Sequence, residues 1–384
     1  MTIVAPFGFY GWGNIGDEST LQGFARLVNL RRPPVSVWVA SRNPAHTRRV
    51  EPSFRYFNVE RAGFRGRWAH RRARAAVFAG GTPVMDGLGS WPLSEVAPLV
   101  ESAHERHQPV AFVGVGTERL DRRESRDIVA NVLAPRVEHW TVRSEHDKER
   151  LVAWRVPADR VTVAADLAWL LRREPDDFGR TVLGELNVSA GEPLIGVNVN
   201  NERVVLERDA RFFEKMAEFL DRSVETYGAR VLFFCSEIRE GSSFDKFAAH
   251  KVLSLMRMAD RATVVPNRYW TPQELLSIIA CCRLTVSMRY HVCLFSAIQG
   301  VPFVAIRRSD KVTDLCSDIS WPFGVSLDDV EVSTLLDHVC EIDRRRESLA
   351  CVLHRATEQQ AARSLVNQVG LDAITDCLEK ERAH

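Results

Sequence analysis

The stretch Ser287-Met-Arg-Tyr-His-Val-Cys-Leu-Phe-Ser-Ala-Ile-Gln-Gly-Val-Pro-Phe-Val-Ala-Ile306 contains the pattern that decides the fold. A short β-rich run, 283–287, opens it, and a second β-rich run, 303–306, closes it. Gly300 and Pro302 break the apolar segment between the two runs. The order of strand, helix, glycine–proline break and strand predicts one unit of a parallel α/β sheet.

Arg289 and His291 lie where the helix of this stretch is expected to begin, at the carboxyl end of a strand. Ligands of open α/β sheets bind at that edge, and the free N–H groups of a helix start attract anions. An arginine and a histidine there suit a phosphate or carboxylate that also needs a proton moved. The structural alternative is a surface ion pair for Arg289 and a capping role for His291.

The same alternation of strands and helices runs along most of the 384 residues. It predicts mostly parallel sheets with helices on both faces. A charged segment interrupts the alternation, which divides the chain into an N-terminal domain (1–175), a linker (176–192), a second domain (193–327) and a helical C-terminal tail (328–384). The predicted fold class is α/β, with two Rossmann-like, doubly wound domains that face a cleft, as in glycosyltransferases of the B type.

Composition excludes several classes of protein. Lys and Arg number 51 and Asp and Glu number 50, so a net charge of +1 provides no global field for nucleic acid. The eight cysteines lack metal-ligand spacing, as do the His, Asp and Glu residues, so we expect no metal. No apolar run approaches about 18 residues, and the first residues lack a signal-peptide pattern. These features predict a cytoplasmic enzyme.

The run 61–74 is rich in arginine and contains Phe64 and Trp68. Its functional interpretation is peripheral contact with the anionic inner face of a membrane, or with the diphosphate of a lipid-linked glycan. The structural alternative is a solvated helix face with one buried aromatic edge.

A second candidate site follows the first predicted strand, where the loop 11–16 fits the pattern G-x-G-x-x-G. Two features disfavour a dinucleotide there. Residues 41–42 are Ser-Arg, where an acidic ribose ligand is expected. Asp17 and Glu18, at the helix start, would repel a phosphate.

The alternative interpretation is a tight glycine loop that lets an acceptor approach the backbone. Gly13, Asn14 and Gly16 are then candidate substrate-binding residues. Asp17 would point into the cleft, and it is also placed to be the N-cap of the following helix.

Taken together, these motifs resemble the polysaccharide pyruvyl transferase family. The resemblance rests on Gly11-Trp-Gly-Asn-Ile-Gly-Asp-Glu18, Ala79-Gly-Gly81, Gly114-Val-Gly116, Val142-Arg-Ser-Glu145 with Asp166, and Ser287-Met-Arg-Tyr-His291 with Gly300-Val-Pro302 and Asp310-Lys-Val312. It extends from the first strand to about Asp318. It implies a two-domain enzyme that transfers a pyruvyl group from phosphoenolpyruvate, a co-substrate, to sugar hydroxyls as a cyclic ketal, without a bound cofactor.

The resemblance also implies roles for single residues. Arg143, at the carboxyl end of a strand, would join Arg289 in binding the phosphate and carboxylate of the donor. Lys311 would add positive charge at the phosphate. His291 would be the general acid, and Asp17 the general base or the residue that orients the acceptor hydroxyl.

The chain departs from the family pattern at Arg307-Arg-Ser-Asp-Lys311, where a Tyr-Asp-Pro-Lys-like run is common. At the start of the second domain, Asn198 and Asn200 are candidate acceptor contacts. Cys235-Ser-Glu237 ends the next strand and should also face the cleft.

The predicted function is therefore pyruvyl transfer to a sugar of a cell-surface polysaccharide or glycan precursor, or of a small glycoside. Two alternatives remain at this stage. One is a sugar-nucleotide-dependent glycosyltransferase of the same architecture. The other is a binding module without catalytic activity, because a fold does not imply a function.

Overall fold

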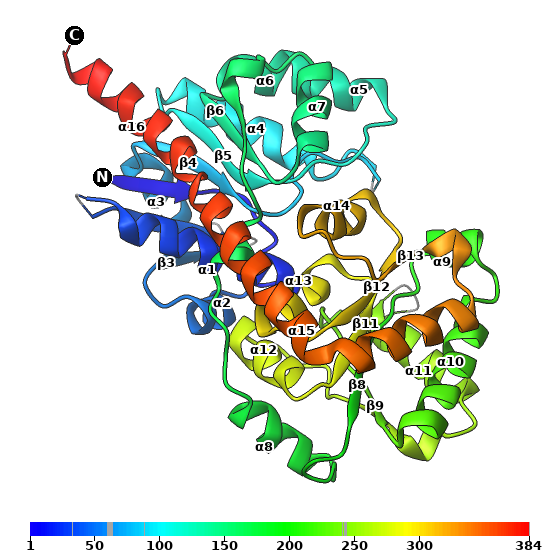
Figure 1. Ribbon diagram of the computed structural model, residues 1–384. Coiled ribbons are helices and arrows are strands. Elements are labelled where there is room, and N and C mark those ends of the chain that lie inside the picture. Colours follow the sequence, from blue (N-terminus) through cyan, green and yellow to red (C-terminus); the bar gives the residue numbers. More distant parts are fainter. Residues whose placement is uncertain (33, 60–63, 88, 240, 242–243, 384) are drawn as a thin grey trace. The chain divides into compact units, whose positions relative to one another are not determined.

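The structure is a computed structural model that describes residues 1–32, 34–59, 64–87, 89–239, 241 and 244–383. The chain divides into two compact units. Unit 1 comprises Met1–Leu171 and Gln360–His384, and unit 2 comprises Arg172–Gln359. Each unit has a parallel sheet with helices on its faces (Figure 1), so the predicted α/β class with two doubly wound sheets is confirmed.

Unit 1 has a seven-stranded sheet in the order β3-β2-β1-β4-β5-β6-β7. Its strands are β1 (Thr2–Ala5), β2 (Ser36–Ser41), β3 (Arg55–Asn58), β4 (Ala75–Ala79), β5 (Val110–Val115), β6 (His139–Val142) and β7 (Val161–Val163). Its helices are α1 (Ile15–Leu30), α2 (Pro44–Val50), α3 (Phe64–Arg72), α4 (Leu93–Glu105), α5 (Arg123–Ile128), η1 (Val129–Leu133), α6 (Ala134–Arg136), α7 (Glu145–Ala153), η2 (Ala158–Arg160), η3 (Leu167–Leu170) and α16 (Gln368–Ala383). The strand order reverses between β1 and β4, which is where this class of fold binds ligands.

Both faces of the unit 1 sheet are buried, which explains the continuous apolar run of β4. Val77 faces a core that includes Leu371 of α16. On the opposite face, Phe78 stacks on Phe112 with ring centroids 4.5 Å apart, and Phe112 stacks on Trp140 at 4.1 Å. These three aromatic residues occupy paired positions on β4, β5 and β6. The register of the parallel strands therefore aligns one aromatic column across the sheet.

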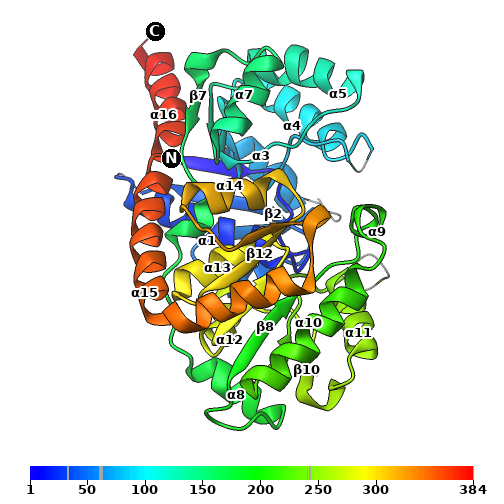
Figure 2. The ribbon, with the colours of Figure 1, turned by 45° about the vertical axis from the view of Figure 1, so that its right-hand side comes forward.

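Unit 2 has a six-stranded sheet in the order β10-β9-β8-β11-β12-β13. Its strands are β8 (Leu194–Asn198), β9 (Arg230–Phe233), β10 (Ala262–Val264), β11 (Leu284–Ser287), β12 (Phe303–Arg307) and β13 (Gly324–Ser326). Its helices are α8 (Asp177–Glu185), α9 (Arg203–Arg208), α10 (Phe212–Tyr227), α11 (Asp245–Leu255), η4 (Ala259–Arg261), α12 (Pro272–Ala280), α13 (Tyr290–Gln299), α14 (Asp310–Asp318), η5 (Leu327–Asp329) and most of α15 (Val332–Leu365). Helices α10 and α11 pack together on one face of the sheet, and α12 and α13 on the other (Figure 2).

The sequence stretch that predicted the fold forms β11, α13 and β12, as expected. Gly300 ends α13 with a left-handed backbone, φ 69°. A β-carbon there would lie 2.3 Å from Nε2 of His354 in α15. The glycine therefore permits both the sharp turn into β12 and the close approach of α15.

The predicted linker, 176–192, contains a packed helix instead. Helix α8 lies against α12, where the backbone N–H of Gly179 donates to Ser277 Oγ at 2.9 Å. The same hydroxyl donates to the carbonyl of Pro175 at 2.6 Å. Because these bonds fix the segment to α12, it belongs to unit 2, which begins at Arg172 and not after the linker.

The predicted separate C-terminal tail, 328–384, is also corrected, because its residues belong to two different units. Residues up to Gln359 are part of unit 2, and α16 packs on β5 and β6 of unit 1. Asn367, which is fully buried, fixes the start of α16. Its amide nitrogen donates to the carbonyls of Ala165 (2.9 Å) and Ser364 (2.8 Å), and its oxygen accepts from Thr141 Oγ1 at 2.5 Å.

Replacement of Asn367 by Ala should therefore destabilise unit 1. Each buried polar group left without a partner costs about 1–3 kcal/mol, and urea denaturation would measure the loss. Glu379→Ala, on the exposed face of α16, is the matched control and should change stability little. Equal stability of the two variants would show that the hydrogen bonds of Asn367 contribute nothing to the stability of unit 1.

Candidate active site

The glycine loop after β1 leads into α1 through an asparagine cap. Asn14 is the N-cap, and its Oδ1 accepts the backbone N–H of Gly16 at 3.2 Å. The prediction that Asp17 caps this helix is therefore wrong, because Asp17 lies within the first turn. Gly11 and Gly13 have φ values of 80° and 73°, which explains why the loop requires glycine.

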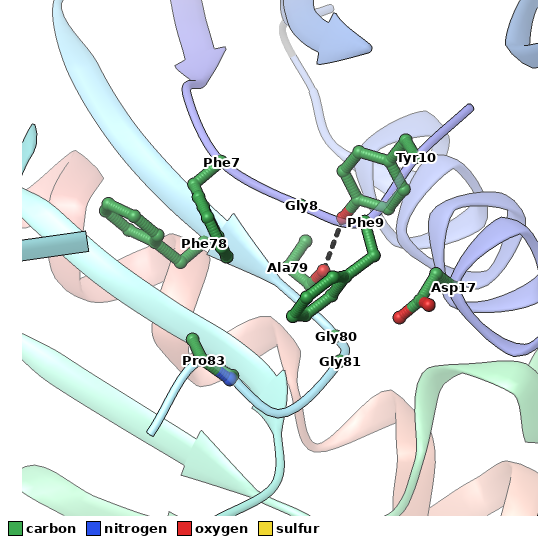
Figure 3. Close-up of a pocket in the computed structure, with 10 residues that line it drawn as sticks. All are labelled: Phe7, Gly8, Phe9, Tyr10, Asp17, Phe78, Ala79, Gly80, Gly81 and Pro83. Atoms are coloured by element: carbon green, nitrogen blue, oxygen red, sulfur yellow. Dashed lines mark hydrogen bonds between the residues drawn. The ribbon is translucent and has the colours of Figure 1, made fainter. Parts of the chain in front are cut away.

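Asp17 lies in a pocket at the β1–β4 switch point of unit 1. The pocket is lined by Phe7, Gly8, Phe9, Tyr10, Asp17, Phe78, Ala79, Gly80, Gly81 and Pro83. Figure 3 shows the Asp17 carboxylate directed toward the Gly80–Gly81 turn, and a β-carbon on Gly81 would lie 3.3 Å from Asp17 Oδ1. The pocket therefore combines one carboxylate with aromatic side chains and the backbone of a glycine turn.

Glu18, the neighbour of Asp17, supports the glycine loop through a hydrogen bond. It is fully buried, and its Oε1 accepts the N–H of Gly11 at 2.6 Å. His46 Nε2 lies 3.8 Å from the same oxygen. Burial raises the pKa of Glu18 to about 8, the Gly11 N–H opposes the rise, and Asp17 adds to it. A protonated Glu18 is neutral, so it would repel a phosphate less than the ionised carboxylate expected from the sequence.

Arg143 is held at the carboxyl end of β6 by a buried ion pair. Its Nη1 lies 3.2 Å from Asp166 Oδ2, and its Nη2 lies 3.5 Å from Thr82 Oγ1. The guanidinium covers Gly116 so closely that a β-carbon there would lie 1.7 Å from Nη2. Because Gly116 N also donates to the carbonyl of Gly81 at 2.9 Å, the glycine motifs and Arg143 share one edge of the unit 1 sheet.

Arg289 is the N-cap residue of α13 and is held by carboxylates. Its Nε and Nη2 lie 3.0 and 2.7 Å from Asp245 Oδ1, and Nη2 also bonds Glu237 Oε1. Its Nη1 lies 3.5 Å from Glu202 Oε1. Burial lowers the pKa of Arg289, but the three carboxylates outweigh burial and raise the pKa, so the guanidinium stays charged.

Asp245, the first residue of α11, is the fully buried partner of Arg289. Burial raises its pKa, but Arg289 and the N–H and hydroxyl of Ser236 outweigh burial, and the net shift is downward. Asp245 Oδ2 accepts from Ser236 N at 2.9 Å and from Ser236 Oγ at 2.7 Å. This carboxylate therefore fixes Arg289 at the carboxyl edge of the unit 2 sheet.

Asn198 and Asn200 were predicted as acceptor contacts, and the structure assigns them a different role. Both are fully buried, and each donates its amide to Asp245, at 2.9 and 3.2 Å. Asn198 also donates to the carbonyl of Phe234, and the Asn200 oxygen accepts the N–H of Glu202 at 2.7 Å. These amides position Asp245 and Glu202 and are not available to an acceptor.

His291 and Lys311 follow adjacent strands of the same sheet. His291 lies in the first turn of α13, half-buried, with its ring edge against Tyr290 at 4.9 Å between centroids. Lys311 lies in the first turn of α14 and is also half-buried. The structure thus brings Arg289, His291 and Lys311 to the carboxyl ends of β11 and β12.

The predicted site residues therefore form two groups, each within one unit. Unit 1 contains Gly13, Asn14, Gly16, Asp17 and Arg143 at the carboxyl edge of its sheet, and unit 2 contains Arg289, His291 and Lys311 at the carboxyl edge of its own.

The sequence patterns single out neither Glu202 nor Asp245, and Arg308 appears only within the run 307–311 that departs from the family pattern. A signal for Asp245 was present, because an acidic residue begins the helix after β9, on the same edge as Arg289.

The basic run 61–74 lies partly outside the described residues, which exclude 60–63. Within α3, Trp68 packs edge-on against Trp38 at 5.0 Å, and the Arg72 guanidinium lies 5.2 Å from the Trp68 ring centroid. Trp68 thus packs as expected for the structural alternative, in which the run is a solvated helix face with one buried aromatic edge. Across the part of the chain that the structure describes, no helix has the length and apolar character needed to cross a membrane, and no group of three or more His, Cys, Asp or Glu could hold a metal.

Comparisons of sequence agree with the motifs. The sequence model of the polysaccharide pyruvyl transferase family matches residues 14–310. The chain is 22% identical to the amylovoran biosynthesis protein AmsJ from Erwinia amylovora over 427 aligned residues, which cover 96% of this chain and 98% of that protein.

Two solved structures of similar fold hold sugar nucleotides. UDP-GlcNAc 2-epimerase from Neisseria meningitidis, bound to UDP-GlcNAc, has a TM-score of 0.62 at 8% identity, over 98% of this chain and 100% of that chain. HepE from Anabaena, in complex with UDP-glucose, has a TM-score of 0.62 at 10% identity, over 100% of this chain and 99% of that chain. At these identities the likeness concerns the fold alone, and it confirms the expected glycosyltransferase-B-like class.

The raised pKa of Glu18 predicts a pH-dependent stability. A proton held more tightly in the folded protein stabilises it at low pH, and this stabilisation is lost as the pH rises from about 4.5 to about 8. Relative to Glu18→Gln, which keeps the acceptor for Gly11, the wild type should lose up to about 1.4 kcal/mol per pH unit.

Urea denaturation of both proteins across this pH range would measure the difference. The comparison with Glu18→Gln removes the contributions of groups that do not interact with Glu18. Parallel pH profiles would show that folding does not raise the pKa of Glu18.

Proposed function

The chain belongs to the polysaccharide pyruvyl transferase family, and we propose that it transfers a pyruvyl group, as a ketal, from phosphoenolpyruvate to the hydroxyls of a sugar in a polysaccharide or glycan precursor. The observation that carries this proposal is the placement of Arg289 and His291 at the start of α13, beside the β8–β11 switch point. An anion-binding group and a proton-transfer group lie two residues apart, as this donor requires.

The chemistry assigns a task to each group. The methylene carbon of the donor gains a proton while a sugar hydroxyl bonds to the adjacent carbon and loses its own proton. Phosphate then leaves, and a second hydroxyl closes the ketal and releases another proton. The reaction therefore needs an acid near the methylene carbon, a base near the hydroxyls, and cations that hold the phosphate and carboxylate.

In this proposal His291 is the acid, and Asp17 is the base or orients the acceptor hydroxyl. Arg289, Arg143 and Lys311 hold the donor. The Asp17 carboxylate supports an acceptor role, since it is directed toward the Gly80–Gly81 turn at the carboxyl edge of the unit 1 sheet, the edge at which this class of fold binds ligands. The ion pairs of Arg143 with Asp166 and of Arg289 with Asp245 support fixed cations whose direction is set before the donor arrives.

The name of AmsJ, an amylovoran biosynthesis protein, supports a polysaccharide setting for the acceptor. We also propose that the protein acts in the cytoplasm without a bound cofactor, and that the basic run 61–74 touches the inner face of the membrane. Because Trp68 packs against Trp38, we assign this contact to the exposed arginines of α3 among the described residues, Arg67, Arg71 and Arg72.

A sugar-nucleotide-dependent glycosyltransferase is the second candidate. The observation that favours it is the fold, which is shared with proteins that bind UDP-GlcNAc and UDP-glucose. Because a fold serves many activities, it supports this candidate less than the paired Arg289 and His291 support the first.

The test of the proposal begins with His291→Gln. We expect phosphoenolpyruvate to raise the melting temperature of both wild type and variant, because the cations that bind it remain. Pyruvyl transfer to a sugar acceptor should fall by roughly 100- to 10,000-fold in kcat, which is the usual contribution of a positioned acid.

The control is His338→Gln, a change of the same type in α15, outside the proposed site, which should leave transfer unchanged. Stabilisation of the wild type by UDP-glucose or UDP-GlcNAc, with no response to phosphoenolpyruvate, would replace this proposal with the glycosyltransferase.

A further inference from the structure

We propose that Glu202 is a displaceable counter-ion at an anion site formed by Arg289 and Arg308, and that Arg308 is a further binding residue for an anionic group of the donor. The anion is a phosphate or carboxylate. That it belongs to phosphoenolpyruvate rests on the proposed function, whereas the site itself rests on the geometry of unit 2.

One carboxylate bridges two guanidinium groups in this site. Glu202 Oε1 lies 3.5 Å from Arg289 Nη1 and 3.2 Å from Arg308 Nη2, and Glu202 Oε2 accepts from Arg308 Nη1. Arginine forks bind phosphate and carboxylate ligands in the same manner. The Glu202 carboxylate thus occupies the position that an external anion would take.

The two cations are fixed and the anion is the accessible member. The Arg289 and Arg308 side chains are 17% and 13% exposed, whereas that of Glu202 is 40% exposed. If Glu202 moves away, Arg289 keeps Glu237 and Asp245, whose side chains are 1% exposed. Displacement therefore leaves no buried carboxylate unpaired, and it moves the most solvated group of the cluster.

Arg308 is held through its backbone and has donor capacity that Glu202 does not use. Its carbonyl accepts from Arg208 Nη1 at 3.1 Å, and its N–H donates to the carbonyl of Ile306 at 3.0 Å. Its Nε is buried without a hydrogen-bond partner. An unsatisfied buried donor is unfavourable, and an anion with more oxygens than a carboxylate, such as phosphate, can satisfy it.

The site lies where ligands of this fold bind. Glu202, Arg289 and Arg308 follow β8, β11 and β12, which are adjacent in the sheet, with the switch point between β8 and β11. Arg308 belongs to the segment 307–311, where the sequence departs from the pattern of the family. This departure places a second guanidinium beside Arg289.

A permanent ion pair between Glu202 and Arg308 that only stabilises the start of α9 would give the same structure. The test must therefore distinguish a displaceable Glu202 from a permanent one. Isothermal titration of the full chain with phosphoenolpyruvate compares wild type, Glu202→Gln, Arg308→Gln and the double variant. Removal of the competing carboxylate should tighten binding about 3- to 10-fold, and loss of Arg308 should weaken it roughly 10- to 100-fold. In the double variant the gain from Glu202→Gln should disappear, because part of the site is gone.

Glu207→Gln is the matched control. Glu207 lies on α9, is exposed, and pairs with Arg203, so this change removes the same charge from the same helix without touching the site. It should leave affinity unchanged. If Glu202→Gln binds no tighter than Glu207→Gln, the inference is overturned and Glu202 is a structural partner of Arg308.

The same four proteins titrated with inorganic phosphate and with UDP-glucose separate this inference from the proposed function. Tighter binding of UDP-glucose by Glu202→Gln, without binding of phosphoenolpyruvate to any variant, would keep the anion site and reject the proposed donor. Tighter binding of phosphoenolpyruvate and of phosphate by Glu202→Gln would support both the anion site and the proposed donor. Absence of tightening for all three anions would reject the counter-ion.

Discussion

The candidate site depends on the need to compensate buried arginines. A guanidinium can be buried only beside a carboxylate, because the loss of hydration is otherwise too unfavourable. Arg143 meets this need through Asp166, and Arg289 through Asp245 and Glu237. Other residues of the sequence make room for these ion pairs or hold their carboxylates in place. Glycine at 116 leaves room for one guanidinium, and the amides of Asn198 and Asn200 hold the partner of the other. Residues that look like ligands in the sequence are thus partly the support of the residues that bind.

The sequence predicts the fold and the edge of the sheet, because both follow from local patterns. Alternation of strand and helix, with glycine after the strands, is enough to give two doubly wound sheets and to place Asp17, Arg143 and Arg289 at carboxyl ends. One detail that failed is local, because Asn14 rather than Asp17 caps α1 through a bond to Gly16. The other depends on contacts distant in the chain, because residue 367 bonds to β6 and to the loop after β7 and so attaches the end of 328–384 to unit 1. Periodicity shows which segments are helical, but not which sheet a helix covers.

The partners of Arg289 illustrate the same limit at the level of side chains. Glu202, Glu237, Asp245 and Arg289 come from four segments, and only the strand order of the sheet brings them together. The sequence shows Arg289 two residues before His291 and an acidic residue at the start of the helix after β9, but it does not show that three carboxylates surround the guanidinium. Orientation by a buried carboxylate is compatible with the proposed binding role of Arg289. The charge that Arg289 can offer an anion is smaller than a bare count of cations would give.

Charge balance at this edge favours local geometry over long-range attraction. Arg239, Arg289 and Arg308 face Glu202, Glu237 and Asp245, so these three cations and three carboxylates cancel, and Lys311 adds a further cation at the same edge. The whole chain, with a net charge of +1, adds almost no field. An anion therefore gains little at a distance and gains most when it replaces a carboxylate hydrogen bond for hydrogen bond. Such a site distinguishes anions by the number and direction of their oxygens. A monovalent ion that replaced Glu202 would form no more hydrogen bonds than the carboxylate did, so it would gain little. A ligand with several anionic oxygens can reach both guanidinium groups at once, and this requirement favours a phosphorylated carboxylic acid over simple salts of the cell.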